Sequence, residues 1–221
     1  MKPVIALNFK TYREATGEKA VELAEIAAGV SLLTGVRIIV CVQAVDLRAV
    51  SRICNDVYGQ HADWQEQGQT TGAVTPEALK DAGAKGSLVN HSERRIAHRE
   101  EIEKIIGRMK ALKLETMVCA HDDEEAEKLA VLGPTFVAVE PPELIGTGRS
   151  VSTAKPEVVR NAVVRVKNAN AKVIPVCGAG ISNAQDVRKA VELGAEGVLL
   201  ASAYVKSSNP KKLLEEMCAV L

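Results

Sequence analysis

Short apolar runs alternate with longer amphipathic segments along the whole chain. The runs are rich in Val and Ile and have the length of buried strands, whereas the segments between them repeat apolar residues with helical period. Ala20, Leu23, Ala24 and Ala27 form one such stripe, which predicts a helix with one face on a sheet. Strands are expected at residues 4–8, 36–42, 57–60, 87–90, 116–119, 136–140, 173–177 and 198–201.

Eight such units share 221 residues, and about 28 residues suit one strand, one helix and two short loops. A single domain over residues 1–221 therefore accounts for the chain. Eight parallel strands either close into a barrel or stay open as a doubly wound sheet. The turn after the first strand lacks GxGxxG, and glycine-rich turns follow strands six and seven, where phosphate-binding barrels tend to bind phosphate. This pattern favours an α/β fold of the (β/α)8 barrel type.

Composition narrows the range of partners. The 28 Lys and Arg residues balance 28 Asp and Glu residues, and 3% of the chain is aromatic. A chain with zero net charge does not attract a polyanion or an anionic membrane surface. We therefore expect no nucleic-acid or membrane partner. No apolar run suits a signal peptide or membrane span, and the five cysteines form no CxxC pair. We therefore expect a cytoplasmic protein with reduced thiols, acting on a small molecule.

Polar residues at the carboxyl ends of barrel strands are candidates for chemistry. Asn8 and Lys10 lie two apart, so both are predicted to face inward while Phe9 turns to the helices. By the same alternation, Val89 and His91 are predicted to face inward. Taken alone, a lysine at a strand end is commonly solvated and a histidine is commonly structural.

Glu140 follows an apolar strand directly, where a carboxylate is costly to desolvate without a function. The segment 141–153 after it is longer than an ordinary βα loop. Two prolines at its start and glycines further along fit a closing flap, although an inert surface loop fits as well.

Small residues follow the last three strands. Such residues let main-chain N–H groups approach an anion, and a helix start adds a favourable dipole, although glycine also serves tight turns. The candidates for a phosphate site are Gly146, Gly178, Gly180, Ala201 and Ser202.

Four motifs in this order resemble the triosephosphate isomerase family, and the likeness spans nearly the whole chain. They are Asn8-x-Lys10, His91-Ser92-Glu93-Arg94-Arg95, Glu140-Pro141 followed by Ile145-Gly146-Thr147-Gly148, and the turn from Gly178 to Gly180. The resemblance implies a TIM barrel that interconverts dihydroxyacetone phosphate and D-glyceraldehyde 3-phosphate through an enediolate. The reaction serves glycolysis and gluconeogenesis, and the resemblance implies no metal and no organic cofactor.

The resemblance also implies roles for single residues. Glu140 would be the base that moves a proton between two carbons, and neutral His91 would polarise the carbonyl. Asn8 and Lys10 would stabilise the enediolate, and Glu93 would support the lysine side. A Glu base paired with a neutral His is the arrangement that the family is known for.

The phosphate would be held by backbone N–H groups, and the loop that begins at Pro141 would close over it. The resemblance assigns these groups to Gly146, Gly180, Ala201 and Ser202.

The chain departs from the family pattern in four ways. Asn90 replaces the glycine usual before the histidine, residues 142–144 replace a tryptophan-containing stretch, and Ala201-Ser202 replaces paired glycines. The chain is also short, which resembles the compact archaeal branch, whose members are typically tetramers. We therefore expect a homo-oligomer, with a tetramer favoured over a dimer. Trp64 is either an interface residue or a simple loop tryptophan.

Two other functions stay open at this point. A metal-dependent sugar-phosphate epimerase could use His61-x-Asp63 and His121-Asp122 as ligands, but it leaves Lys10 without a role. A non-catalytic barrel that binds a sugar phosphate is the second alternative. His98 and His121 are predicted to face solvent near helix starts.

Overall fold

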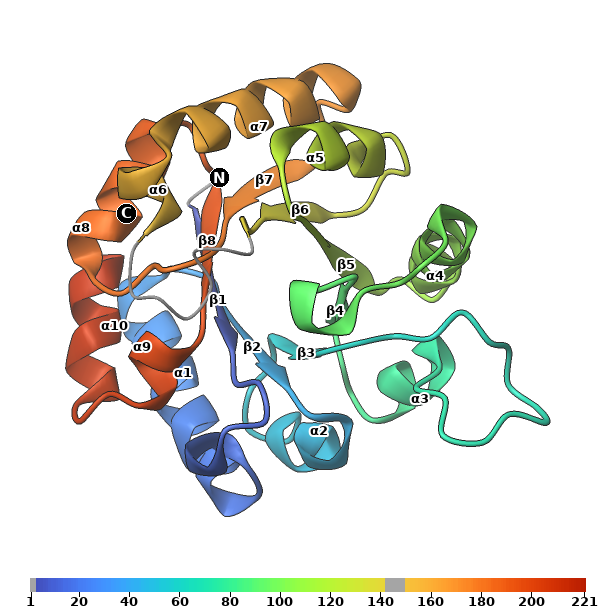
Figure 1. Cartoon of the computed structure of the whole chain (residues 1–221). Helices are drawn as coiled ribbons and strands as arrows, with labels where there is room; N and C mark the ends of the chain where they lie inside the picture. Colours follow the sequence, from blue (N-terminus) through green and yellow to red (C-terminus); the bar gives the residue numbers. More distant parts are fainter. Residues whose placement is uncertain (1–2, 142–149) are drawn as a thin grey trace.

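The computed structural model describes residues 3–141 and 150–221 of the chain. Within these residues, eight parallel strands close into a barrel in sequence order, with β8 paired to β1. Helices surround the barrel (Figure 1). The expected (β/α)8 barrel is confirmed. The strands are β1 Val4–Asn8, β2 Ile38–Val42, β3 Val57–Gly59, β4 Gly86–Val89, β5 Glu115–Ala120, β6 Phe136–Val139, β7 Ile174–Cys177 and β8 Gly197–Leu200.

Four of the helices in the described residues begin at a polar residue that caps the first turn. Thr75, Asp122, Asn183 and Asn209 each accept a hydrogen bond from the backbone N–H three residues later. In the described residues, no helix is both long and apolar enough to cross a bilayer. The helical elements are η1 Arg13–Ala15, α1 Glu18–Thr34, α2 Ala44–Val50, α3 Pro76–Asp81, η2 Ser92–Arg94, α4 Arg99–Ala111, α5 Asp123–Ala130, α6 Val151–Ala154, α7 Pro156–Ala169, α8 Ala184–Glu192, α9 Ser202–Val205 and α10 Pro210–Cys218.

Two apolar layers flank the strands, because side chains alternate between the barrel interior and the helices. The outer layer holds Phe9, whose ring lies 6.1 Å from that of Tyr204. Phe9 therefore faces the helices as predicted. The interior layer consists of Val4, Ala6, Ile39, Cys41, Tyr58, Leu88, Met117, Cys119, Phe136, Ala138, Val176 and Leu199.

The prediction that Val89 faces inward with His91 was wrong for Val89. Leu88 belongs to the interior layer, whereas Val89 packs in the outer layer with the helices. Asn90 has a φ of 62°, in the left-handed region, and this breaks the alternation after β4. His91 therefore reaches the barrel mouth although its parity is that of an outward residue.

Two hydrogen bonds hold the left-handed backbone of Asn90. Its Nδ2 donates to the Cys119 carbonyl, and its Oδ1 accepts from the Ile96 N–H, each at 3.0 Å. Asparagine tolerates this conformation better than most residues do. This explains why asparagine can occupy this left-handed position.

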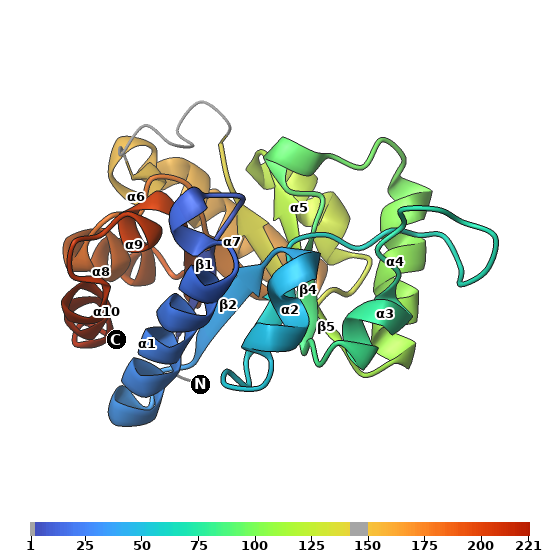
Figure 2. The same ribbon diagram turned by 90° about the horizontal axis from the view of Figure 1, so that it is seen from below.

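The segment between β3 and α3 extends away from the barrel, as both views show (Figures 1 and 2). Arg108 of α4 holds the start of this segment in place. It donates hydrogen bonds to the carbonyls of Trp64 (2.8 Å) and Gln65 (2.6 Å) and forms an ion pair with Glu77. The Trp64 side chain is 37% exposed, and the Lys104 ammonium lies over its ring. The protruding segment thus presents an aromatic surface on an anchored base.

Candidate active site

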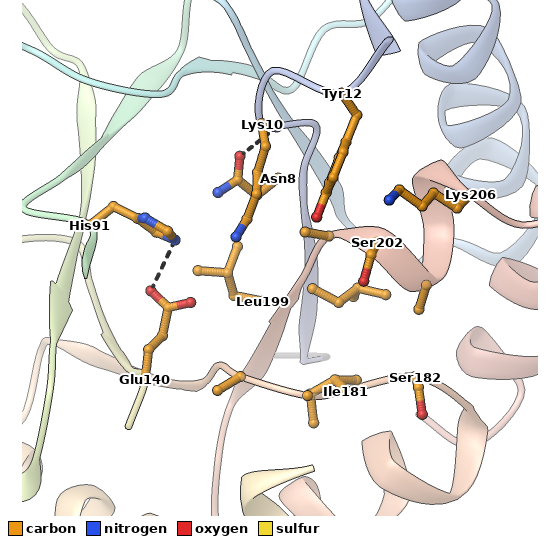
Figure 3. Close-up of a pocket in the computed structure, with 15 residues that line it drawn as sticks. Asn8, Lys10, Tyr12, His91, Glu140, Ile181, Ser182, Leu199, Ser202 and Lys206 are labelled. Carbon is orange, nitrogen blue, oxygen red and sulfur yellow. Dashed lines mark hydrogen bonds and ion pairs between the residues drawn. The ribbon is translucent and has the colours of Figure 1, made fainter. Parts of the chain in front are cut away.

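The carboxyl ends of the strands enclose a pocket of about 320 Å³. Side chains from β1, β4 and β6 approach each other across it, and loops after β7 and β8 form the opposite wall (Figure 3). Most of the residues singled out from the sequence therefore meet in one place. The lining is Asn8, Lys10, Tyr12, His91, Glu140, Ala179, Gly180, Ile181, Ser182, Leu199, Leu200, Ala201, Ser202, Ala203 and Lys206.

Glu140 stands just past β6 and faces His91. Its Oε2 lies 3.5 Å from His91 Nε2, and each residue is 5% exposed. The backbone N–H of Glu140 donates to the Ala120 carbonyl, which fixes the base of the side chain. In the described part of the chain, Glu140 Oε2 is buried without a hydrogen-bond partner. Buried polar atoms without a partner are uncommon, which makes Glu140 a candidate for a functional group.

Gly178 leaves room for the Glu140 side chain. A Cβ atom on Gly178 would lie 2.4 Å from Glu140 Cγ, a distance that real Cβ atoms do not show. Gly178 is not among the described residues that line the pocket, and its predicted contact with the substrate stays a prediction. Its role is to let the carboxylate pack against the β7 turn.

The Nδ1 atom of His91 accepts a hydrogen bond from the Glu93 backbone N–H over 3.2 Å. An accepting nitrogen carries a lone pair, so this bond places the hydrogen of the neutral ring on Nε2. The donor of His91 then points at Glu140 and into the pocket.

Lys10 is held in a strained conformation just past β1. Its φ is 48°, a left-handed value that costs a non-glycine residue about 1 kcal/mol or more. Its backbone N–H donates to Asn8 Oδ1 at 3.0 Å, and its Nζ donates to Glu93 Oε1 at 2.7 Å. Glu93 also places Oε2 3.7 Å from His91 Nδ1. Glu93 therefore contacts both His91 and Lys10, and the supporting role that the resemblance implies for it stays a prediction.

Burial and ion pairing shift the pKa values of His91 and Glu140 in opposite directions. Burial would lower the pKa of His91, yet the Glu140 carboxylate outweighs it and raises that pKa above 6.5. Burial would raise the pKa of Glu140, yet His91 outweighs it and holds that pKa below 4.5. Each group therefore favours the charged form of its neighbour as long as the two lie side by side.

The opposite wall of the pocket presents main chain. Ala179 and Gly180 follow β7 with consecutive left-handed φ values of 68° and 73°. Ala201 and Ser202 follow β8 and begin the short helix α9. Turns of this kind expose backbone N–H groups to a bound anion. Gly146, the remaining predicted phosphate residue, lies outside the described residues.

A model of the triosephosphate isomerase family matches residues 3–218. The chain belongs to the triosephosphate isomerase family. The triosephosphate isomerase of Methanothermus fervidus is 52% identical over 217 residues, which cover 98% of this chain and 97% of that protein. The triosephosphate isomerase of Methanocaldococcus jannaschii is 47% identical over 215 residues, which cover 97% and 98%. The resemblance inferred from the four motifs is therefore confirmed, and so is the expected class of enzyme, an isomerase.

A solved structure adds a likeness in fold. The crystal structure of triosephosphate isomerase from Bartonella henselae matches with a TM-score of 0.74 at 24% identity. The match covers 100% of this chain and 99% of that one. The barrel of the triosephosphate isomerase family is thus retained in a chain that differs in three of four aligned residues.

The residues considered for a metal-dependent epimerase pair with each other. His61 Nε2 lies 2.9 Å from Asp63 Oδ1, and His121 Nε2 lies 2.9 Å from Asp122 Oδ2. No group of three potential metal ligands is found in residues 3–141 and 150–221. His98 and His121 are exposed, as predicted. Membership of the triosephosphate isomerase family decides against the epimerase alternative.

Sequence reasoning missed Tyr12 and Lys206, which also line the pocket. The Lys206 ammonium lies 4.5 Å from the centre of the Tyr12 ring. The two residues are far apart in the chain, so no local motif connects them. Their positions in the chain could have indicated that they line the pocket. Tyr12 follows Lys10 by two residues, and Lys206 follows the turn after β8.

Proposed function

We propose that the chain interconverts dihydroxyacetone phosphate and D-glyceraldehyde 3-phosphate, with Glu140 as the base. The observation that carries this proposal is the arrangement of Glu140 Oε2 3.5 Å from His91 Nε2 in a pocket that Lys10 also lines. Removing a proton beside a carbonyl needs a base on carbon and donors at the oxygens. The pocket is lined by both kinds of group, a carboxylate and the donors of His91, Lys10 and Asn8.

The steps follow from the atoms that face the pocket. Glu140 takes a proton from one carbon of the triose and returns it to the neighbouring carbon. His91 donates from Nε2 to the oxygens of the enediolate and exchanges protons between them. Asn8 and Lys10 stabilise the negative charge on those oxygens. One well-placed donor is worth about 3 kcal/mol of transition-state stabilisation.

Entry of the substrate shifts the pKa values of Glu140 and His91 toward the protonation states that the reaction needs. Burial is the largest single influence on both His91 and Glu140. A triose between the two side chains separates them, which removes the pairing and leaves burial to dominate. The pKa of Glu140 then rises, which makes the carboxylate a stronger base, and the pKa of His91 falls, which keeps the ring neutral.

The phosphate lies against the opposite wall in this proposal. Backbone N–H groups of Gly180, Ala201 and Ser202 hold it, with Gly146 as a further donor. The segment that begins at Pro141 closes over the substrate and excludes water. The left-handed turn at Gly180 and the helix start at Ser202 support this placement.

The test is a coupled assay for triose phosphate isomerisation in the presence of a chelator. We expect full turnover, because no step of the proposed mechanism uses a metal ion or an organic cofactor. Loss of turnover that returns with a divalent cation would support a metal-dependent reaction. Tight phosphate binding without any turnover would support the non-catalytic barrel.

We further propose that the chain acts in the cytoplasm as a single-domain homo-oligomer, with a tetramer favoured over a dimer. Cys41, Cys54, Cys119 and Cys177 are buried and free of disulfides, which suits a reducing compartment. The protruding segment with Trp64 offers a surface for a second copy. Light scattering coupled to gel filtration tests the assembly, and a monomer at micromolar concentration would contradict it.

A further inference from the structure

The charges that line the pocket are unevenly distributed. At the proposed reaction end, the Lys10 ammonium is paired with Glu93 at 2.7 Å, so a carboxylate already balances its charge. Among the described residues that line the pocket, Glu140 is the sole carboxylate, and it lies at the same end. Among the described residues that line the pocket, the ammonium at the reaction end therefore already has a carboxylate partner.

Lys206 lies at the other end of the pocket. Figure 3 shows its ammonium beside Tyr12, on the wall opposite Glu140. Its backbone N–H donates to the Ser202 carbonyl at 2.9 Å, which fixes the residue relative to α9. Among residues 3–141 and 150–221, no carboxylate forms a salt bridge with Lys206. Its charge is therefore uncompensated on the wall where main-chain turns face the pocket.

Tyr12 holds this ammonium without cancelling its charge. The Lys206 Nζ lies 4.5 Å from the centre of the Tyr12 ring, a cation–π contact. An aromatic face attracts a cation but carries no net charge, so the lysine can still bind an anion. Tyr12 also restricts a long side chain that would otherwise be mobile in solvent, which reduces the entropy lost when Lys206 binds.

We infer that Lys206 is a substrate-binding residue for the phosphate of the triose and that Tyr12 is its positioning residue. The inference rests on the proposed function, since it uses the same pocket and substrate. An ammonium–phosphate contact is present in the bound substrate and in the transition state alike. Such uniform binding lowers KM and raises kcat/KM while kcat stays nearly constant.

The kinetic experiment compares K206Q with K212Q. Lys212 is an exposed lysine on α10 whose ammonium lies 3.8 Å from Glu216, so both variants lose one positive charge. We expect K206Q to raise KM by about 10- to 100-fold with kcat within about threefold. We expect K212Q to behave as the native enzyme and K206R to recover most of the loss. The kcat/KM of K206Q should also depend less on ionic strength than that of the native enzyme.

Substitution of Tyr12 separates positioning from binding. Y12F keeps the aromatic face and should leave KM nearly unchanged. Y12L removes that face and should raise KM by a smaller factor than K206Q does, again with kcat nearly constant. A fall in kcat for Y12L at unchanged KM would overturn the positioning role.

A binding experiment needs no turnover. Inorganic phosphate is titrated by calorimetry into the native enzyme, K206Q and K212Q. We expect Kd for phosphate to rise in K206Q by about the factor seen in KM and to stay unchanged in K212Q. Native phosphate affinity in K206Q, or equal falls of kcat and kcat/KM, would overturn the inference. If the native enzyme lacked isomerase activity while K206Q still lost phosphate affinity, the proposed function would fail and the phosphate contact would stand.

Discussion

Charged side chains gather at both ends of the barrel, but their hydrogen bonding differs. At the amino-terminal end, Arg37 precedes β2 and donates to both Asp56 and Glu115, and the Tyr58 hydroxyl donates to Glu115. No atom of this cluster is among the buried polar atoms that lack a partner in the described residues. At the carboxyl-terminal end, Glu140 Oε2 and Ser92 Oγ are buried without partners among residues 3–141 and 150–221, and Lys10 has a left-handed backbone.

This difference shows how to separate a structural cluster from a functional one. A satisfied network stabilises the fold, whereas unsatisfied groups and backbone strain persist at a site that binds something else. Burial alone does not distinguish them, because both ends contain titratable groups with shifted pKa values. The comparison predicts that substitutions at the two ends separate activity from stability.

The largest effect on activity is expected for E140Q. The variant keeps the shape of the side chain but removes the base, so kcat should fall by about 10³-fold or more. The free energy of unfolding should change by about 1 kcal/mol or less, because the lost contact with His91 is offset by relief from burying a charge. Steady-state kinetics and urea unfolding measure the two quantities. Retained turnover would remove Glu140 from its assigned role.

H91A should follow, with a loss of about 10²- to 10³-fold in kcat, because it removes a donor to the enediolate oxygens. His98 and His121 are exposed histidines that serve as controls. H98A and H121A should retain kcat within about twofold. Equal losses in all three variants would show that His91 has no special part in the reaction.

R37M should have the opposite effect, lowering the free energy of unfolding while leaving activity unchanged. It leaves Asp56 and Glu115 without their shared cation, and since all three side chains are about one-third exposed, we expect a cost of about 2 kcal/mol. The kcat and KM of the folded enzyme should be unchanged. R48M is the matched control, because the Arg48–Asp81 pair is exposed, and it should cost about 0.5 kcal/mol or less.

The same cluster makes stability depend on pH. Burial would raise the pKa of Glu115, but hydrogen bonds from Arg37 and Tyr58 outweigh it and lower that pKa below 4.5. A lowered folded pKa means that the contribution is present above pH 4.5 and is lost as pH falls through the folded value. The stability difference between the native enzyme and E115Q should therefore be constant near neutrality and shrink below pH 4.5. Urea unfolding at several pH values measures it, and a difference that widened in acid would contradict the assignment.

Most of the barrel could be predicted because strands must bury apolar side chains on both faces. Each strand begins and ends within two residues of the expected range. The catalytic candidates Lys10, His91 and Glu140 could be predicted because barrel topology brings strand ends together. The steric role of Gly178 and the contact between Tyr12 and Lys206 could not, since both depend on segments distant in sequence. The cluster of Arg37 with Asp56, Tyr58 and Glu115 was not predicted, because a charged residue before a strand looks like an ordinary loop residue.

Val89 does not face inward as expected, and the reason is local to the next residue. A last pair of variants tests this explanation. Alternation assumes extended backbone, but Asn90 is left-handed at a φ of 62°. N90G relieves about 1 kcal/mol of backbone strain but loses both amide hydrogen bonds, at about 1 kcal/mol each, so a net cost of about 1 kcal/mol is expected. N90A loses the same bonds and keeps the strain, so it should cost about 2 kcal/mol. Urea unfolding ranks the two variants, and N90A as stable as N90G would show that the left-handed backbone does not matter for the turn that carries His91.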